Sequence, residues 1–184
     1  MNKPSALFLI ILAALALLAF YMGLFQLPAT TIMTRFTALS AFFLLCVSLI
    51  IGPLVIFWPQ RFVLLIEPRR AVGVAAFLFM SAHILLVLLN YFGGNIALVF
   101  SSINYLIAIP AVVIFLALTL TSLDIMVRFM GNSKWKMLHR LTYIAFTLVF
   151  IHFFLNASGL FLQAGKGLFV NLAELFMILF GGVA

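Results

Sequence analysis

The chain has 184 residues, of which 67% are hydrophobic and only 7% carry a formal charge. A soluble domain of this size needs a polar surface that this composition does not supply, so soluble enzymes and soluble binding modules are excluded. A net charge of +7 would suggest nucleic acid as a partner of a soluble protein, but here the charges lie between apolar runs and set membrane orientation. We therefore expect an all-α protein embedded in the lipid bilayer, with no nucleic-acid partner.

Apolar runs of helix length follow one another along the chain, and none has the alternation of a barrel strand. Short polar or Gly/Pro-bearing joints separate them. The predicted spanning helices cover residues 5–26, 36–58, 71–92, 106–123, about 131–155 and 167–183. The sequence thus predicts a single domain over residues 1–184, a six-transmembrane-helix bundle that makes multiple passes through the cell (inner, or cytoplasmic) membrane.

The joints contain residues that end helices. A short turn at 27–31 is expected to lead through Arg35 into the second helix, which ends at Trp58-Pro59 because proline cannot continue the hydrogen-bond ladder. Gly93-Gly94-Asn95 is expected to break the third helix. Pro110 is expected near the start of the fourth helix, where a proline costs least.

Lysine and arginine gather on one predicted side of the membrane. They occur at the N-terminus, in the 59–70 connection and in the 125–140 segment, whereas the opposite joints hold only Arg35 and Lys166. Cytoplasmic loops carry the excess of positive charge, so both termini should be cytoplasmic. Asp124 is expected to pair with basic residues at the inner surface. The lone cysteine excludes an intramolecular disulfide.

All three histidines lie at or within membrane depth. His83 is about 12 residues into the third helix and His152 about 15 residues into the fifth, which puts both roughly 18 to 23 Å from the cytoplasmic surface. His139 lies near the inner surface, where the matching level of the third helix offers Gly73 and two arginines instead of a histidine. The sequence predicts a complete outer pair and a half-built inner site.

Two imidazoles at equal depth suit a low-spin b-type haem, whose axial positions both take nitrogen and whose role is electron transfer. The alternative is that each histidine only hydrogen-bonds a neighbouring helix, as polar residues in membranes often do. A zinc site is less natural, because no carboxylate lies at the same depth. At about 100° per residue, His139 and His152 would not face one cleft from a straight helix.

The basic residues near the inner surface have two readings. Arg140, Arg69 and Arg70 are either interface anchors or groups that hold a propionate or a phosphate by charge-assisted bonds. Asn171 and Glu174 share a face of the last helix, and a proton or quinone role for them is a minor alternative. Asn156-Ala157-Ser158 matches a glycosylation acceptor, a tripeptide that is common by chance.

The order of these residues is that of a known family. The motif residues are Arg69-Arg70-x-x-Gly73, His83, Thr121-Ser122, Arg128, Gly131, Trp135-x-x-Leu138-His139-Arg140-Leu141-x-Tyr143 and His152. Over about residues 36–157 the chain resembles the ferric reductase-like transmembrane domain. Within that family it is most similar to the haem-binding membrane subunits of periplasmic methionine sulfoxide reductase systems.

The resemblance implies a six-helix haem b cytochrome with His83 and His152 as axial ligands of the iron. Relatives in the NADPH oxidase and ferric reductase group hold two stacked haems with two histidines on each of two helices. Here Arg69 stands fourteen residues before His83, so one haem is expected, and His139 is a candidate for a second site. The resemblance also implies flavin mononucleotide (FMN), for which the space near Gly73, Arg69, Arg70 and His139 is a candidate.

The function expected from the resemblance is electron transfer by a non-catalytic subunit of an oxidoreductase system. Electrons would come from a cytoplasmic reductase or from a quinol of the quinone pool, because the chain shows no Gly-rich nucleotide-binding motif. They would pass to an exported soluble reductase. The alternatives are a stand-alone ferric or oxygen reductase and a structural or transport membrane protein without haem.

Overall fold

The computed structural model describes residues 12–13, 16–17, 20 and 28–156, and all regular structure within these residues is helical. In chain order the elements are α2 (Ala29–Phe57), α3 (Pro59–Phe62), the 3-10 turn η1 (Val63–Leu65), α4 (Ile66–Asn90), η2 (Ile96–Ser101), α5 (Ile103–Leu120), α6 (Asp124–Met130), α7 (Asn132–His139) and a last helix over 141–156. Most of the predicted helix over 5–26, the whole of that over 167–183 and both termini lie outside the described residues.

Helices that are long and apolar enough to cross a membrane make up most of the described chain. Four candidate spans occur within the described residues: Ala29–Phe57, Pro68–Asn90, Ile103–Leu120 and Asn132–Asn156. They correspond to the second, third, fourth and fifth predicted helices. The all-helical, multi-span character of the fold is therefore confirmed for this part of the chain.

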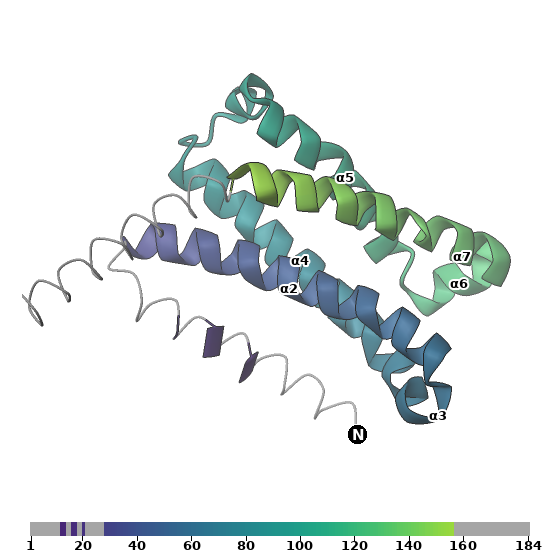
Figure 1. The fold of residues 1–184 in the computed structure, drawn as a ribbon. Helices are drawn as coiled ribbons and strands as arrows, with labels where there is room; N and C mark the ends of the chain where they lie inside the picture. Colours follow the sequence, from purple (N-terminus) through teal and green to yellow (C-terminus); the bar gives the residue numbers. More distant parts are fainter. Residues whose placement is uncertain (1–11, 14–15, 18–19, 21–27, 157–184) are drawn as a thin grey trace, which may run out of the picture.

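The α2 and α4 helices lie side by side and run antiparallel (Figure 1). Thr34 near the start of α2 is hydrogen-bonded to His83 near the end of α4, and Ser48 near the end of α2 is hydrogen-bonded to Arg69 near the start of α4. The bundle consequently has two distinct ends. We call the end with Arg69 the basic end and the end with His83 the far end.

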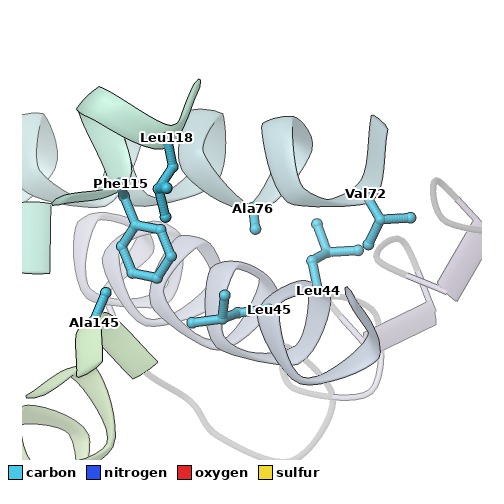
Figure 2. Close-up of a cluster of buried hydrophobic side chains, with 7 residues drawn as sticks. All are labelled: Leu44, Leu45, Val72, Ala76, Phe115, Leu118 and Ala145. Atoms are coloured by element: carbon cyan, nitrogen blue, oxygen red, sulfur yellow. The ribbon is translucent and has the colours of Figure 1, made fainter. Parts of the chain in front are cut away.

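A small apolar cluster joins the four long helices at the middle of the bundle (Figure 2). Its members are Leu44 and Leu45 of α2, Val72 and Ala76 of α4, Phe115 and Leu118 of α5, and Ala145 of the last helix. Ala145 is 0% exposed, so the last helix approaches its neighbours most closely where its side chain is smallest. This packing holds the four helices together at the middle of the bundle.

Local backbone chemistry accounts for the helix ends. Trp58 leaves the helical region at φ −134°, ψ 65° because the residue before a proline is disfavoured there. Gly93 (φ 56°) and Gly94 (φ 83°) follow the end of α4 in a left-handed conformation that glycine adopts without steric cost. The predicted break at Gly93-Gly94-Asn95 is confirmed.

Several predicted boundaries are wrong by a few residues. Because α2 begins at Ala29, Arg35 lies within this helix and not in a preceding turn. Because α4 begins at Ile66, Arg69 and Arg70 lie on a helix and not in a connection. Because α5 begins at Ile103, Pro110 lies inside it. Apolar runs mark the hydrocarbon region, whereas a helix continues past it for as long as its backbone hydrogen bonds are satisfied.

The segment predicted as a basic loop after residue 124 contains two short helices. Gly131 (φ 75°, ψ 151°) separates α6 from α7, and the two helices lie together at the basic end (Figure 1). The fifth predicted helix is also interrupted, because Arg140 forms a turn between α7 and the helix over 141–156. The phase argument against one straight helix carrying both His139 and His152 therefore no longer applies.

Candidate functional site

The far end brings His83 and His152 together from two helices. The two imidazoles are close enough to interact electrostatically. His83 Nδ1 lies 3.0 Å from the carbonyl oxygen of Thr34 on α2, and His152 Nδ1 lies 2.7 Å from the carbonyl oxygen of Asn104 on α5. Four helices thus contribute to this pair, which the sequence predicted from depth alone.

These two hydrogen bonds decide the tautomer of each ring. A carbonyl oxygen only accepts, so Nδ1 must carry the proton and donate it. The lone pair is then on Nε2, which makes no hydrogen bond to any described residue in either histidine. A neutral imidazole held through Nδ1–H with Nε2 available is the arrangement of metal-ligating histidines, because the first bond fixes the ring and raises the basicity of the second nitrogen.

Aromatic and amide side chains surround the histidine pair. The Tyr105 ring lies 6.4 Å from the His152 ring and 5.0 Å from the Phe92 ring, measured between centroids. Asn90 Nδ2 is 3.5 Å from Thr34 Oγ1, so α4 contacts the start of α2 a second time. The rings therefore lie in a largely apolar setting, with backbone carbonyls as the polar groups closest to them.

At the basic end, Arg69 is fixed against α2. Its Nε donates to the carbonyl oxygen of Ser48 at 2.9 Å. Its guanidinium group also lies against Gly52, where an added Cβ would be 3.5 Å from three guanidinium atoms. A Cβ added at Gly73 would lie 3.6 Å from Ser48 Oγ. Arg69 and Gly73 therefore face α2, which the sequence did not predict.

Arg70 points toward the loops that follow α5. Its Nη1 forms an ion pair with Asp124 at the start of α6, which confirms the predicted pairing of this carboxylate with a basic residue. Trp135 Nε1 donates to the carbonyl oxygen of Thr121 at 3.0 Å. These two bonds tie α6 and α7 to the ends of α4 and α5.

His139 is held by stacking and not by a hydrogen bond through its ring. Its ring centroid lies 4.1 Å from that of Trp135, with 33° between the planes. Its Nε2 is buried without a hydrogen-bond partner among the described residues, and the ring interacts electrostatically with Arg70 and Arg69. One imidazole and two guanidinium groups thus lie near one another at the basic end, and a binding role for them stays a prediction.

Other predicted site residues are less involved. The Arg140 side chain is exposed and makes no hydrogen bond or ion pair to any described residue. Asn171, Glu174 and most of the 156–158 tripeptide lie outside the described residues. In the part of the chain that the structure describes, no group of three His, Cys, Asp or Glu side chains is arranged to hold a metal ion.

Sequence reasoning missed the groups that orient these histidines. The Thr34 and Asn104 carbonyls are backbone atoms, so no residue type signals them. In the sequence Trp135 is only a residue of the family motif, whereas in the structure its ring lies 4.1 Å from that of His139. The run of aromatic and basic residues before His139 was the only available signal for that role.

One protein family matches this sequence over most of its length. The model of the family described as ferric reductase like transmembrane component matches residues 7–150. The chain belongs to the ferric reductase-like transmembrane family. Together with the four apolar helices, this match makes the chain a multi-pass membrane protein.

Curated relatives of this ferric reductase-like protein are about 30% identical to it over the aligned residues. The protein-methionine-sulfoxide reductase heme-binding subunit MsrQ of Ralstonia nicotianae is 31% identical over 130 residues, which cover 68% of this chain and 59% of the relative. The protein of the same name from Herminiimonas arsenicoxydans is 30% identical over 161 residues, covering 84% of this chain and 73% of the relative.

A third relative shows how this kind of domain occurs in larger proteins. The magnetosome protein MamZ of Magnetospirillum gryphiswaldense is 31% identical over 94 residues, which cover 49% of this chain and 14% of that protein. This chain thus matches about three fifths of the length of the Ralstonia protein and one seventh of the length of MamZ. No solved structure matches the chain significantly.

Proposed function

We propose that this protein is a haem b electron-transfer subunit in which His83 Nε2 and His152 Nε2 are the axial ligands. The observation that carries the proposal is the pair of Nδ1–H to carbonyl hydrogen bonds, 3.0 Å and 2.7 Å long, which leave both Nε2 lone pairs for a metal. When bound, haem supplies a reversible one-electron centre. The names of two relatives, as heme-binding subunits, support the same cofactor.

The residues present fit a haem with two imidazole ligands. Both histidines are only partly buried by protein, and the Tyr105 ring, which itself packs on Phe92, lies beside His152. The Thr34 and Asn104 carbonyls each hold one imidazole through Nδ1, so these bonds would orient the Nε2 atoms toward a bound haem. Two strong nitrogen ligands would exclude substrate from the iron, which favours electron transfer over catalysis at the metal.

We further propose the direction and the partners. The excess of Lys and Arg at the basic end indicates that this end faces the cytoplasm, with six spans and both termini on that side. Electrons would arrive there from a cytoplasmic reductase or from a quinol and leave at the far end. The acceptor would be an exported reductase, such as a methionine sulfoxide reductase catalytic subunit, in view of the names of the relatives.

Direct reduction of ferric iron at the far end is a second candidate function. It is favoured by the description of the matching family as ferric reductase like. It differs from the first candidate in needing no exported protein partner. FMN is a second cofactor suggested by the resemblance, and FMN content in the purified protein measures it independently of haem.

The proposal is tested with the full chain purified in detergent. Reduced-minus-oxidised absorption spectra should show one bis-imidazole haem per chain, and His83→Ala or His152→Ala should abolish it. The matched control is His139→Ala, which should keep the far-end haem. A protein that binds no haem would leave a structural or transport role, and reduction of ferric iron without any partner would favour the second candidate.

A further inference from the structure

The two far-end histidines are held by carbonyl oxygens that accept unequal numbers of hydrogen bonds. A carbonyl oxygen has two lone pairs, and inside an α-helix one of them already accepts the backbone N–H four residues on. The Asn104 carbonyl, in the first turn of α5, also accepts His152 Nδ1–H at 2.7 Å. No other side chain among the described residues donates to it. Two donors thus occupy two lone pairs.

The Thr34 carbonyl on α2 accepts one donor more. It receives His83 Nδ1–H at 3.0 Å and also the Thr37 hydroxyl at 2.9 Å. Together with the backbone N–H of the helix, three donors share two lone pairs. The His83 bond, at 3.0 Å, is longer than the His152 bond, at 2.7 Å, which is the order that this competition requires.

The Thr37 hydroxyl has a second acceptor within reach. Its Oγ1 lies 3.0 Å from the carbonyl oxygen of Met33 and 2.9 Å from that of Thr34. A hydroxyl has a single proton, so it divides this proton between the two carbonyls. The larger the share that goes to Thr34, the weaker is the bond that His83 makes to the same oxygen.

The surroundings of Thr34 prevent other groups from relieving this competition. Thr34 and Thr37 are only 4% and 9% exposed, so water does not replace either donor. The Thr34 hydroxyl donates to the Thr30 carbonyl at 2.8 Å, and Asn90 Nδ2 lies 3.5 Å from the same hydroxyl. The side chain at position 37 therefore decides how many donors the Thr34 carbonyl accepts.

The strength of an Nδ1–H bond changes the chemistry of the other ring nitrogen. A stronger bond to a carbonyl makes Nε2 more basic. A more basic axial ligand stabilises ferric over ferrous iron and so lowers the reduction potential. Because the Thr37 hydroxyl weakens the His83 bond, it acts in the opposite direction and raises the potential.

We propose that Thr37 is a positioning residue of the far-end site, whose hydroxyl competes with His83 Nδ1–H for the Thr34 carbonyl and thereby raises the reduction potential. The inference rests on the proposed haem ligation by His83 and His152. The two ligands are then unequal, with His152 the more basic. Thr37 touches neither the iron nor its ligand nitrogens and acts only through the shared carbonyl.

The experiment compares the full chain with Thr37→Val, which removes the hydroxyl and keeps the branched shape of the side chain. Two quantities are measured in detergent. One is the chemical shift of each histidine Nδ1 proton by ¹⁵N-edited NMR under dithionite, where low-spin ferrous iron is diamagnetic. The other is the equilibrium constant for one-electron reduction, from a redox titration followed by absorption.

The expected shifts have a definite direction. In the unmodified chain the His152 Nδ1 proton should resonate further downfield than that of His83, because its hydrogen bond is shorter. Thr37→Val should move the His83 proton downfield and leave the His152 proton in place. It should also lower the equilibrium constant for reduction about two- to tenfold, as expected for part of a neutral hydrogen bond.

Two control variants separate this effect from a general loss of packing. Thr37→Ser keeps a hydroxyl at the same position and should retain both values of the unmodified chain. Thr147→Val removes a hydroxyl that donates to the Tyr143 carbonyl at 3.0 Å on the last helix, away from both histidine bonds. It should change neither value.

Three results would overturn the inference. One is an unchanged His83 proton shift in Thr37→Val. Another is an unchanged or raised equilibrium constant for reduction in a Thr37→Val chain that retains its haem. The third is an effect of the same size in Thr147→Val, which would mean that any lost hydroxyl acts alike. A chain that binds no haem is a different result, because it refutes the proposed function itself and with it the tuning of a potential.

Discussion

The two ends of the bundle use the same imidazole side chain in opposite ways. At the far end, His83 and His152 are each held through Nδ1 by a carbonyl oxygen from another helix. At the basic end, His139 stacks on Trp135, and its Nε2 is buried beside two arginines without a partner. The comparison shows that the hydrogen-bond partner of a histidine ring decides what the ring can bind. Only in the far-end pair does a bond at Nδ1 leave the Nε2 lone pair available for metal coordination.

The position of Arg69 adds to this difference between the two ends of the bundle. Arg69 takes the level at which the related two-haem proteins are expected to place a histidine, and it is bound to Ser48 on α2. The resulting positive potential opposes a metal cation and favours an anion. The far end is therefore proposed for iron.

The largest expected effect is the loss of haem when either far-end histidine is removed. His83→Ala or His152→Ala leaves one axial ligand and should abolish the bis-imidazole absorption spectrum, whereas His139→Ala should keep it. Haem content per chain measures the effect. Equal losses in all three variants would remove the distinction between the two ends.

A second prediction concerns the packing that connects the two ends. Ala145 is 0% exposed in the cluster that joins the four long helices (Figure 2). Ala145→Leu should overpack this cluster and destabilise the protein by about 1 to 3 kcal/mol. Thermal unfolding in detergent measures the loss, and Ile144→Leu, at an exposed neighbouring position, is the control. An unchanged unfolding midpoint in Ala145→Leu would show that the cluster does not hold the helices together.

A third prediction concerns the basic end alone. Trp135→Phe keeps an aromatic wall for His139 but removes the hydrogen bond to the Thr121 carbonyl. The expected cost is about 1 kcal/mol of stability, with an unchanged far-end haem spectrum. The unfolding midpoint and the spectrum are measured on the same sample. A changed spectrum would contradict the independence of the two ends.

The smallest effect is expected for the Arg70–Asp124 ion pair. Its side chains are 37% and 79% exposed, so solvent screens the attraction. Asp124→Asn should therefore change stability by less than about 1 kcal/mol. A loss of several kcal/mol at low and high salt would show that the pair is a structural anchor.

Much of the fold follows from hydropathy, because a span in lipid must be a long apolar helix. All four candidate spans within the described residues coincide with predicted helices. Their ends do not, since Arg69, Arg70 and Arg35 lie on helices that continue beyond the apolar run. The interruption at Arg140 is a tertiary feature, and the sequence there reads as continuous helix.

One part of the candidate site was predictable, because side chains at the same depth on neighbouring helices can lie close together. Equal depth predicted that His83 and His152 meet, and their rings do interact electrostatically. Their anchoring by Thr34 and Asn104 was not predictable, because backbone carbonyls leave no mark in the sequence. Haem ligation itself stays a prediction.

Imidazole rescue of the far-end ligands tests the central claim most directly. His83→Gly and His152→Gly in the full chain should each lose the low-spin spectrum of bound haem and regain it when free imidazole fills the space of the missing side chain. His139→Gly should neither lose nor regain it. A low-spin bis-imidazole spectrum that persists in either far-end variant without added imidazole would contradict the account.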